Sequence, residues 1–236
     1  RPEDRGFHEA CWFPSSHLGS VSDHWNNDYF DDMYFHQGRR AATEGYTTDV
    51  LFAKAIEGMR AEMSAKRPFF CYLPTAAPHG PHYVPAEYRA RMTEAVQAAR
   101  DRLPMLPPPR LEQLTRYLAM IANLDDNVGR LEMFLREAGL RDNTIVVFLT
   151  DNGSTFGADY YPAGMKGRKT TLWEGGHRVP CFVRWPAGGL QSPGDVPGLT
   201  QVGLASLAVT FQVPLGVGQA GMPQAMGYCF STCMLE

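Results

Sequence analysis

The sequence predicts an α/β fold, a mixed sheet flanked by helices. Two apolar segments with strand character, and one long amphipathic helix pattern between them, predict this class. The composition agrees, because 236 residues with 44% hydrophobic and 20% charged side chains are typical of a globular protein. A chain of this length buries roughly 70 to 75% of its unfolded surface, so it forms a sizeable core without disulfides or structural metal.

The first strand is predicted at Pro68–Leu73, where the apolar run P-F-F-C-Y-L lies between Pro68 and Pro74. A short apolar run bounded by prolines is typical of a buried strand. His79 follows shortly after its end. Further on, the proline-rich stretch Leu103–Pro109 predicts a loop or extended connector.

A long amphipathic helix is predicted after this connector. Apolar residues recur there at three- and four-residue intervals, which places them on one helical face. They are Leu114, Leu118, Ile121, Leu124, Val128, Leu131 and Leu135. The helix is expected to end near Gly139, since glycine commonly follows a helix.

The second strand is predicted at Thr144–Thr150, a continuous β-branched and apolar run of the kind found in strands covered on both faces. It leads directly into Asp151-Asn152-Gly153. Val179–Trp185 is a third, weaker strand pattern. Ligands of α/β sheets bind beyond the carboxyl ends of strands, so His79 and Asp151 are both expected beside such a crevice.

The charge pattern does not favour nucleic acid as a partner. The 22 Lys and Arg residues nearly balance the 25 Asp and Glu residues, the net charge is −3, and neither sign forms a long run. The five cysteines are odd in number and contain no C-x-x-C, so they predict neither a disulfide framework nor a zinc site. No stretch reaches the ~18 apolar residues of a membrane span.

The two ends of the sequence are unusual. It starts at Arg1 and has its first methionine at Met33, so we expect a chain that is processed or cut from something longer. The tail Gly203–Glu236 has no charged side chain before Glu236. It is either a buried core segment or sequence foreign to the natural protein, as a frame error would produce. We therefore divide the chain into residues 1–202 and an atypical uncharged tail, residues 203–236.

Two short motifs carry candidate site residues. Asp151 and Asn152 offer carboxylate and amide oxygens, which suit Ca²⁺ or Mg²⁺ rather than zinc, although D-N-G is also a frequent turn sequence. His79 and His82 lie in A-P-H-G-P-H, a loop that prolines stiffen. Two imidazoles there suit hydrogen bonding to an anion or protonation of a leaving group. A pair of surface histidines is the alternative.

A third segment gathers cations among glycines. G-M-K-G-R-K at Gly164–Lys169 is followed by E-G-G-H-R at Glu174–Arg178. Cations on a glycine-rich backbone suit a tetrahedral anion, and a solvated basic loop is the alternative. The sequence has no P-loop pattern, so nucleotide binding is not predicted.

Taken together, these motifs are more specific than any of them alone. In order, the chain contains R-P-E-D-R-G-F-H-E, N-D-Y-F-D-D, A-P-H-x-P, a strand followed by D-N-G, and K-x-x-x-x-E-G-G-x-R-V-P. This order resembles the sulfatase family of the alkaline-phosphatase-like superfamily. The resemblance covers residue 1 to about residue 202 and implies the mixed sheet of that superfamily.

The resemblance implies roles for individual residues. The D-N pair of sulfatases supplies two ligands of a divalent metal, usually calcium, which points to Asp151 and Asn152. The histidine of H-x-P contacts the sulfate ester and assists departure of the alcohol, which points to His79. His82 is a weaker candidate for substrate contact. The lysine five residues before E-G-G contacts sulfate, which points to Lys169, with Lys166 as a less favoured alternative.

Other sulfatase features are absent from this sequence. The amino-terminal aspartate pair, the C-x-P-S-R signature whose cysteine becomes formylglycine, and G-K-W-H-L-G do not occur. Cys11 lies in C-W-F-P-S-S, which has one residue too many before proline and no arginine. The acidic group Asp28, Asp31 and Asp32 is expected to be a solvated turn.

The sequence therefore predicts part of a sulfuric ester hydrolase, with a small-molecule or glycan sulfate ester as its substrate. We expect the isolated chain to be inactive, because the formylglycine cysteine is missing. A phosphate or phosphonate monoester hydrolase and a noncatalytic metal- or anion-binding remnant are the alternatives. The resemblance implies an exported, periplasmic or lysosomal protein, while the compartment and oligomeric state stay open.

Overall fold

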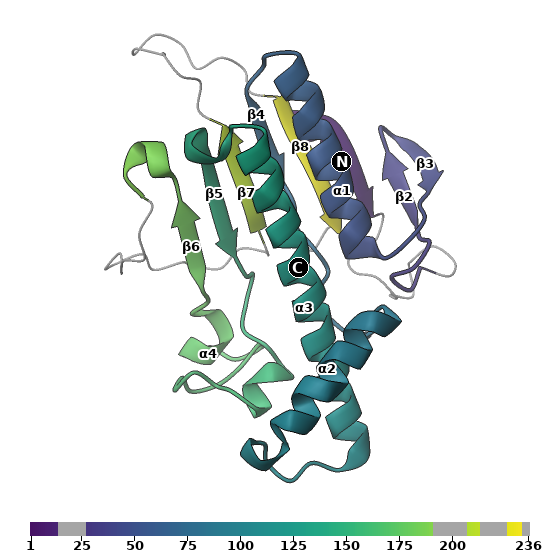
Figure 1. Ribbon diagram of the computed structural model, residues 1–236, viewed down its shortest axis with the longest axis vertical. Coiled ribbons are helices and arrows are strands. Elements are labelled where there is room, and N and C mark those ends of the chain that lie inside the picture. The colour runs from purple at the N-terminus through teal and green to yellow at the C-terminus, as the bar shows by residue number, and fades with distance from the viewer. Residues whose placement is uncertain (14–26, 191–206, 213–225, 233–236) are drawn as a thin grey trace.

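A computed structural model describes residues 1–13, 27–190, 207–212 and 226–232, and these form one mixed sheet with helices α1 and α3 across one of its faces (Figure 1). The strands follow the order β3-β2-β1-β8-β4-β7-β5-β6. Their bounds are β1 Phe7–Phe13, β2 Met33–His36, β3 Arg39–Ala42, β4 Phe69–Tyr72, β5 Thr144–Leu149, β6 Cys181–Arg184, β7 Leu207–Gln212 and β8 Met226–Thr232. The helices are α1 Thr47–Ser64, α2 Ala86–Ala98, α3 Pro108–Glu137 and α4 Glu174–His177.

Strands β4 and β5 run in the same direction. Each pairs antiparallel with β7, which lies between them. Their carboxyl ends therefore meet the same edge of the sheet, as the order of strand, helix and strand in the sequence predicts. The predicted α/β class and all three predicted strands are confirmed.

The two described segments of the uncharged tail are interior strands. β8 pairs parallel with β1 and with β4, and β7 lies between β4 and β5. A sequence without charged side chains suits interior strands of an α/β sheet, since helices cover the faces from which their side chains project. The rest of the tail lies outside the described residues.

The predicted amphipathic helix is α3, and it begins earlier than expected. Pro108 is its first residue, so the proline-rich connector ends at Pro107. Proline suits the first helical turn, because its missing N–H would have no partner there and its φ angle is already helical. Helix α3 ends at Glu137, and Gly139 follows with φ +68°.

The core lies between the sheet and helices α1 and α3. Helix α1, for which no sequence-based prediction was made, buries Leu51, Phe52, Ala55 and Met59. Their helical spacing is the signal that could have revealed it. The N-cap residue is Tyr46, and no side chain caps the first turn. The sequence therefore has no capping residue that would indicate where this helix begins.

Strand β5 differs from its prediction in one respect. Its residues Ile145–Leu149 are only partly buried, and Cys181, Phe182 and Val183 of the neighbouring β6 are exposed. The expectation that this strand is covered on both faces is wrong for the described residues. A β-branched run reports the preference for an extended backbone, and the cover on each face depends on elements distant in the sequence.

Candidate active site

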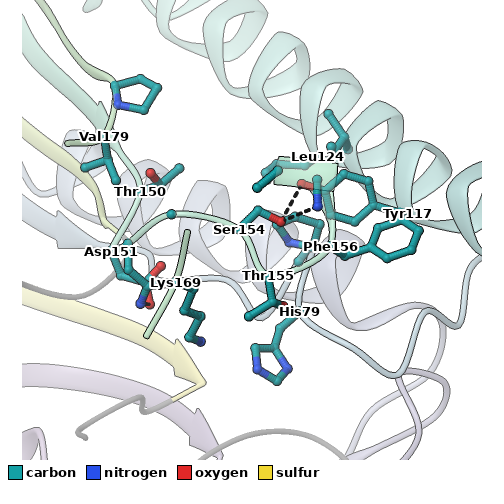
Figure 2. Close-up of a pocket in the computed structure, with 18 of the residues that line it drawn as sticks. His79, Tyr117, Leu124, Thr150, Asp151, Ser154, Thr155, Phe156, Lys169 and Val179 are labelled. Carbon is teal, nitrogen blue, oxygen red and sulfur yellow. Dashed lines mark hydrogen bonds between the residues drawn. The ribbon is translucent and has the colours of Figure 1, made fainter. Parts of the chain in front are cut away.

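A cavity of about 750 Å³ lies beyond the carboxyl ends of β4 and β5. Its walls come from the segments after these two strands, from helix α3 and from the loop before α4 (Figure 2). All five residues predicted for the site line it, namely His79, His82, Asp151, Asn152 and Lys169. In Figure 2, Asp151, Lys169 and His79 lie along one side, while Tyr117 and Phe156 lie near α3.

We call residues 77–83 the His79 loop. The Nδ1 atom of His79 lies 2.7 Å from the carbonyl oxygen of Gly80. A carbonyl only accepts hydrogen bonds, so this contact places the ring proton on Nδ1. The Nε2 atom of the neutral ring is then an acceptor, and it becomes a donor when the ring is protonated. His79 is thus suited to transfer a proton through Nε2.

His82 belongs to the same loop but has a different environment. Its ring lies 5.6 Å from the Tyr117 ring and 5.5 Å from the Phe156 ring, measured between centroids. Burial lowers the pKa of His82, and electrostatic interaction with His79 and with Arg116 lowers it further, against a backbone hydrogen bond at Pro78 that raises it. His82 is therefore neutral near pH 7 and forms part of an aromatic wall.

Asp151 and Asn152 follow β5 after one residue, Thr150, and both are half-buried. The Asn152 amide donates a hydrogen bond to Oδ2 of Asp151 over 2.6 Å. The turn depends on Gly153, whose N–H donates to the carbonyl oxygen of Gly176 over 3.0 Å. A Cβ atom at position 153 would overlap the carbonyl oxygen of Gly175, so only glycine permits this approach.

The carboxylate of Asp151 and the amide oxygen of Asn152 fit a calcium or magnesium ion in ligand type. They do not fit in number, because Ca²⁺ takes about six to eight oxygen ligands. Nowhere in the described parts of the chain do three or more His, Cys, Asp or Glu side chains gather as a metal site. The two residues can therefore contribute ligands but do not make a complete metal site by themselves.

The two candidate lysines lie in a loop that we call the lysine loop, Gly164–Trp173. The Nζ atom of Lys166 lies 3.4 Å from the centre of the Trp173 ring, and this lysine is exposed. Lys169 is half-buried and lines the cavity. Within the described ranges, no carboxylate lies within ion-pair distance of Lys169, whereas the nearby Arg168 pairs with Asp159 at 3.1 Å. Lys169 is thus the cation of this loop that can meet an anion in the cavity.

The E-G-G sequence explains how this loop reaches the Asp151 turn. The N–H of Gly175 donates to the carbonyl oxygen of Lys166 over 2.9 Å. A Cβ atom on Gly175 would overlap the carbonyl oxygen of Gly167, and Gly167 has φ +81°. Backbone therefore packs against backbone here, and the glycines are needed for that contact.

Two other sequence-based assignments are decided by burial. Cys11 lies in β1 with 1% exposure, and burial raises the pKa of its thiol to about 12, so it is unsuited to be a nucleophile. The expected solvated turn is wrong for Asp32, which is 1% exposed. Burial raises the pKa of Asp32 to about 6, and its carboxylate accepts hydrogen bonds from its own turn and from helix α1.

The aromatic wall was missed by the sequence analysis. Tyr117 of α3 and the Phe156 ring lie 5.3 Å apart, and Tyr160 contacts Phe156 at 5.0 Å. All three line the cavity. Tyr117 departs from the apolar period of α3, which is a weak signal that its side chain faces something other than the sheet.

One cavity beyond the carboxyl ends of two strands thus combines a histidine, a lysine, a carboxylate and an amide. A family model described as Sulfatase matches residues 3–202. The chain belongs to the sulfatase family. Its α/β sheet has the alkaline-phosphatase-like arrangement of that family's solved structures.

Curated sulfatases are similar to this chain at low identity. An uncharacterized sulfatase of Escherichia coli, YdeN, is 29% identical over 198 residues, which are 83% of this chain and 31% of YdeN. An arylsulfatase of Klebsiella aerogenes is 26% identical over 68% of this chain and 42% of its own length. A canine N-acetylgalactosamine-6-sulfatase is 26% identical over 61% of this chain and 24% of its own length. The chain thus spans less than half of these sulfatases.

Two solved structures are similar in fold. Ps i-CgsB, solved in complex with k-i-k-neocarrahexaose, has a TM-score of 0.64 and 27% identity. The match covers 79% of this chain and 41% of that protein. The putative sulfatase yidJ of Bacteroides fragilis has a TM-score of 0.52 and 26% identity over 73% of this chain and 38% of its own. Among the described helices, none combines the length and apolar character that a membrane crossing requires.

Proposed function

We propose that this chain supplies the anion-binding and leaving-group part of the active site of a sulfuric ester hydrolase. The observation that carries the proposal is that His79 and Lys169 line the same cavity as Asp151, although they are distant in the sequence. A cation suits the binding of a sulfate ester, an imidazole suits the protonation of its departing alkoxide, and a carboxylate can hold a metal cation beside them.

Cleavage of a sulfate ester requires a nucleophile that bonds to sulfur, stabilisation of the sulfuryl oxygens and protonation of the departing alkoxide. We assign the second and third of these tasks to this chain. In our proposal the ammonium group of Lys169 contacts the sulfuryl oxygens and stabilises their charge. The Nε2 atom of protonated His79 donates its proton to the alkoxide oxygen. The hydrogen bond from Nδ1 to Gly80 keeps the ring oriented during this transfer.

A divalent cation, Ca²⁺ or Mg²⁺, is part of the proposal. Asp151 and Asn152 would hold it, together with ligands from outside the described residues. When bound, such an ion supplies positive charge that polarises the sulfuryl oxygens. Asp151 contributes the negative charge that makes this position attractive to a cation.

We further propose that these 236 residues by themselves do not turn over a sulfate ester. The sulfatase nucleophile is a formylglycine made from the cysteine of C-x-P-S-R, and this sequence contains no such signature. Cys11 does not replace it, because its thiol is buried and has a raised pKa.

For the substrate, we propose a small-molecule or glycan sulfate ester. A cavity of about 750 Å³ is large enough for a ring-shaped alcohol group. Its aromatic wall of Tyr117, Phe156 and His82 suits the flat face of such a ring. The similar structure of Ps i-CgsB, solved with k-i-k-neocarrahexaose, supports the inclusion of glycans.

Titration of the chain with inorganic sulfate tests the anion site. Lys169→Ala is expected to weaken sulfate binding about tenfold or more, because it removes a charge-assisted contact. Lys166→Ala is the matched control, since it removes the same charge from the same loop but from a side chain that packs on Trp173. Equal losses in both variants would show that sulfate responds to general charge, and would contradict the proposal.

Ester hydrolysis tests the proposed inactivity of this chain and the preference for sulfate esters. The first substrate is 4-nitrophenyl sulfate, in the presence of calcium. The purified chain is expected to release no 4-nitrophenol above its Lys169→Ala variant, and release above that control would overturn the proposed inactivity. In a longer protein that contains C-x-P-S-R, sulfate esters are expected to be cleaved faster than phosphate esters. Faster phosphate cleavage would favour a phosphohydrolase, and calcium binding without any hydrolysis would favour a noncatalytic remnant.

A further inference from the structure

Two buried tyrosines hold the His79 loop at two points. The hydroxyl of Tyr29 donates a hydrogen bond to the carbonyl oxygen of His79 over 2.9 Å. The hydroxyl of Tyr46 donates to the carbonyl oxygen of Tyr83 over 3.0 Å. The rings of Tyr29 and Tyr46 stack with their centroids 5.9 Å apart. A single aromatic pair in the core therefore supports the loop at His79 and at Tyr83.

Tyr29 is itself held in place by Asp32. The Oδ2 atom of Asp32 accepts hydrogen bonds from the Tyr29 N–H over 3.2 Å and from the Thr47 hydroxyl over 2.8 Å. Thr47 is the first residue of helix α1. Tyr29 and Asp32 are each 1% exposed. The position of the Tyr29 hydroxyl is thus fixed relative to the helix that packs on the sheet.

The backbone of Tyr29 is strained. Its φ angle is +84°, in the left-handed region that side chains other than glycine rarely adopt. Such strain persists only where surrounding contacts enforce it, and it concentrates at functional sites. Here the hydrogen bonds to Asp32 enforce it, and the strained backbone directs the Tyr29 ring toward the His79 loop.

The His79 ring is tied to the same stretch of backbone. Its Nδ1 atom bonds to the carbonyl oxygen of Gly80, the residue next to the one whose carbonyl Tyr29 holds. The orientation of these two successive carbonyl groups therefore sets the direction of Nε2. A change at the Tyr29 hydroxyl reaches the ring through two covalently linked peptide groups.

We propose that Tyr29 is a positioning residue for His79, which fixes the loop backbone so that the Nε2 atom of His79 faces the bound sulfate ester. The inference rests on the proposed function for the role of Nε2. The N-D-Y-F-D-D segment then has a function in the site without touching substrate. Asp32 and Thr47 support it by holding Tyr29.

A purely structural role for Tyr29 is the competing explanation, and Tyr34 provides a matched control for it. Tyr34 is also fully buried, with 0% exposure. Its hydroxyl donates to Thr47 Oγ1 over 3.0 Å, so it is bonded to the same threonine but not to the His79 loop. Tyr29→Phe and Tyr34→Phe each remove one buried hydroxyl and one hydrogen bond.

Nuclear magnetic resonance of the histidine rings separates the two explanations in this chain. Tyr29→Phe is expected to shift the ring resonances of His79 and to change its balance of Nδ1–H and Nε2–H tautomers. Tyr34→Phe is expected to leave both as in the unsubstituted protein. His36, which contacts Glu9 over 3.2 Å, serves as an internal reference. Unchanged His79 resonances in Tyr29→Phe, or equal changes in both variants, would overturn the proposal.

The second measurement is sulfate affinity. Tyr29→Phe is expected to weaken binding of inorganic sulfate about two- to tenfold, and Tyr34→Phe to change it less than about twofold. If the unsubstituted chain binds no sulfate, the proposed function fails at its anion site, and the His79 resonances alone decide the role of Tyr29. If Tyr29→Phe does not fold, 3-fluorotyrosine at position 29 replaces it, with 3-fluorotyrosine at position 34 as its control. A His79 shift only for position 29 then supports the proposal, and no such shift overturns it.

Discussion

The loops that bring His79 and Lys169 to the cavity differ in how they are held in place. The His79 loop is held by side chains, the hydroxyls of Tyr29 and Tyr46, which reach it from the core. The lysine loop and the Asp151 turn are held by backbone hydrogen bonds at Gly153 and Gly175. The first support depends on hydroxyl groups, and the second includes close backbone contacts that only glycine permits.

This difference decides which substitutions each loop tolerates. A loop held by hydroxyl groups is weakened when an atom is removed, because a buried hydrogen bond is lost. A loop held by close backbone contacts is disrupted when an atom is added, because the packed interior has no space for it. The two halves of one active site are therefore sensitive to opposite changes.

The largest effect is expected for Gly153→Ala. Its new methyl group would overlap the carbonyl oxygen of Gly175, so the turn and α4 must separate. We expect the free energy of unfolding to fall by about 3 kcal/mol, measured by urea denaturation. In the His79 loop, a Cβ atom at Gly80 would meet only Nε2 of His82, at 3.9 Å, so Gly80→Ala is expected to cost less than about 1 kcal/mol.

Gly129→Ala is the control for adding a methyl group elsewhere. Gly129 lies inside α3, and a Cβ atom there meets no atom within 4 Å. This substitution is expected to stabilise the protein by about 0.5 to 1 kcal/mol, since alanine favours the helix. If Gly153→Ala behaved like Gly129→Ala, the backbone contact at the Asp151 turn would not be a support, and the contrast between the loops would be lost.

The next largest effect is a pH dependence of the free energy of unfolding, which comes from Asp32, the residue that holds Tyr29. Burial raises the pKa of Asp32 from its ordinary value of 3.8 to about 6. Between these values the folded protein binds more protons than the unfolded protein, so the free energy of unfolding falls as the pH rises from about 4 to about 6. The fall is roughly 1 to 3 kcal/mol, at about 1.4 kcal/mol per pKa unit.

Asp32→Asn removes this titration. The difference in unfolding free energy between the unsubstituted protein and Asp32→Asn should decline from about pH 4 to about pH 6 and then stay constant. The lowered pKa of His82 acts in the opposite direction, with stability lost as the pH falls below 6.5, but it is shared by both proteins and cancels in the difference. Two parallel pH curves from urea denaturation would refute the raised pKa of Asp32 and the burial of its carboxyl group that causes it.

The smallest effect is expected for Lys166→Met within the lysine loop. It removes the cation over the exposed Trp173 ring but keeps a long side chain, so about 0.5 to 1 kcal/mol of stability is lost. Sulfate affinity should stay within about twofold, in contrast to Lys169→Ala. Lys66→Met, at an exposed lysine in another part of the chain, controls for the loss of one charge in thermal denaturation. A large loss of sulfate affinity would show that both lysines of the loop serve the cavity.

Much of the architecture around the site was predictable from local patterns. The apolar run at Phe69–Tyr72, the β-branched run at Thr144–Leu149 and the helical period of α3 each report a preference of the backbone over a few turns or residues. Helix α1 was not predicted although its apolar spacing is helical, because no capping residue marks its start. Strands β2 and β3 were not predicted because each has only four residues. Proline at the start of α3 was interpreted as a connector, although it suits a first helical turn.

By itself, the sequence determined the fold class, the resemblance to the sulfatase family and the five candidate site residues, since each follows from a local pattern or an ordered set of motifs. Only the tertiary structure decided that Lys169, and not Lys166, faces the cavity, because Trp173 holds the other lysine. It also decided that Asp32 is buried and that Tyr29 contacts His79, fifty residues away in sequence. Burial and long-range hydrogen bonds depend on how distant segments pack, and no local pattern encodes them.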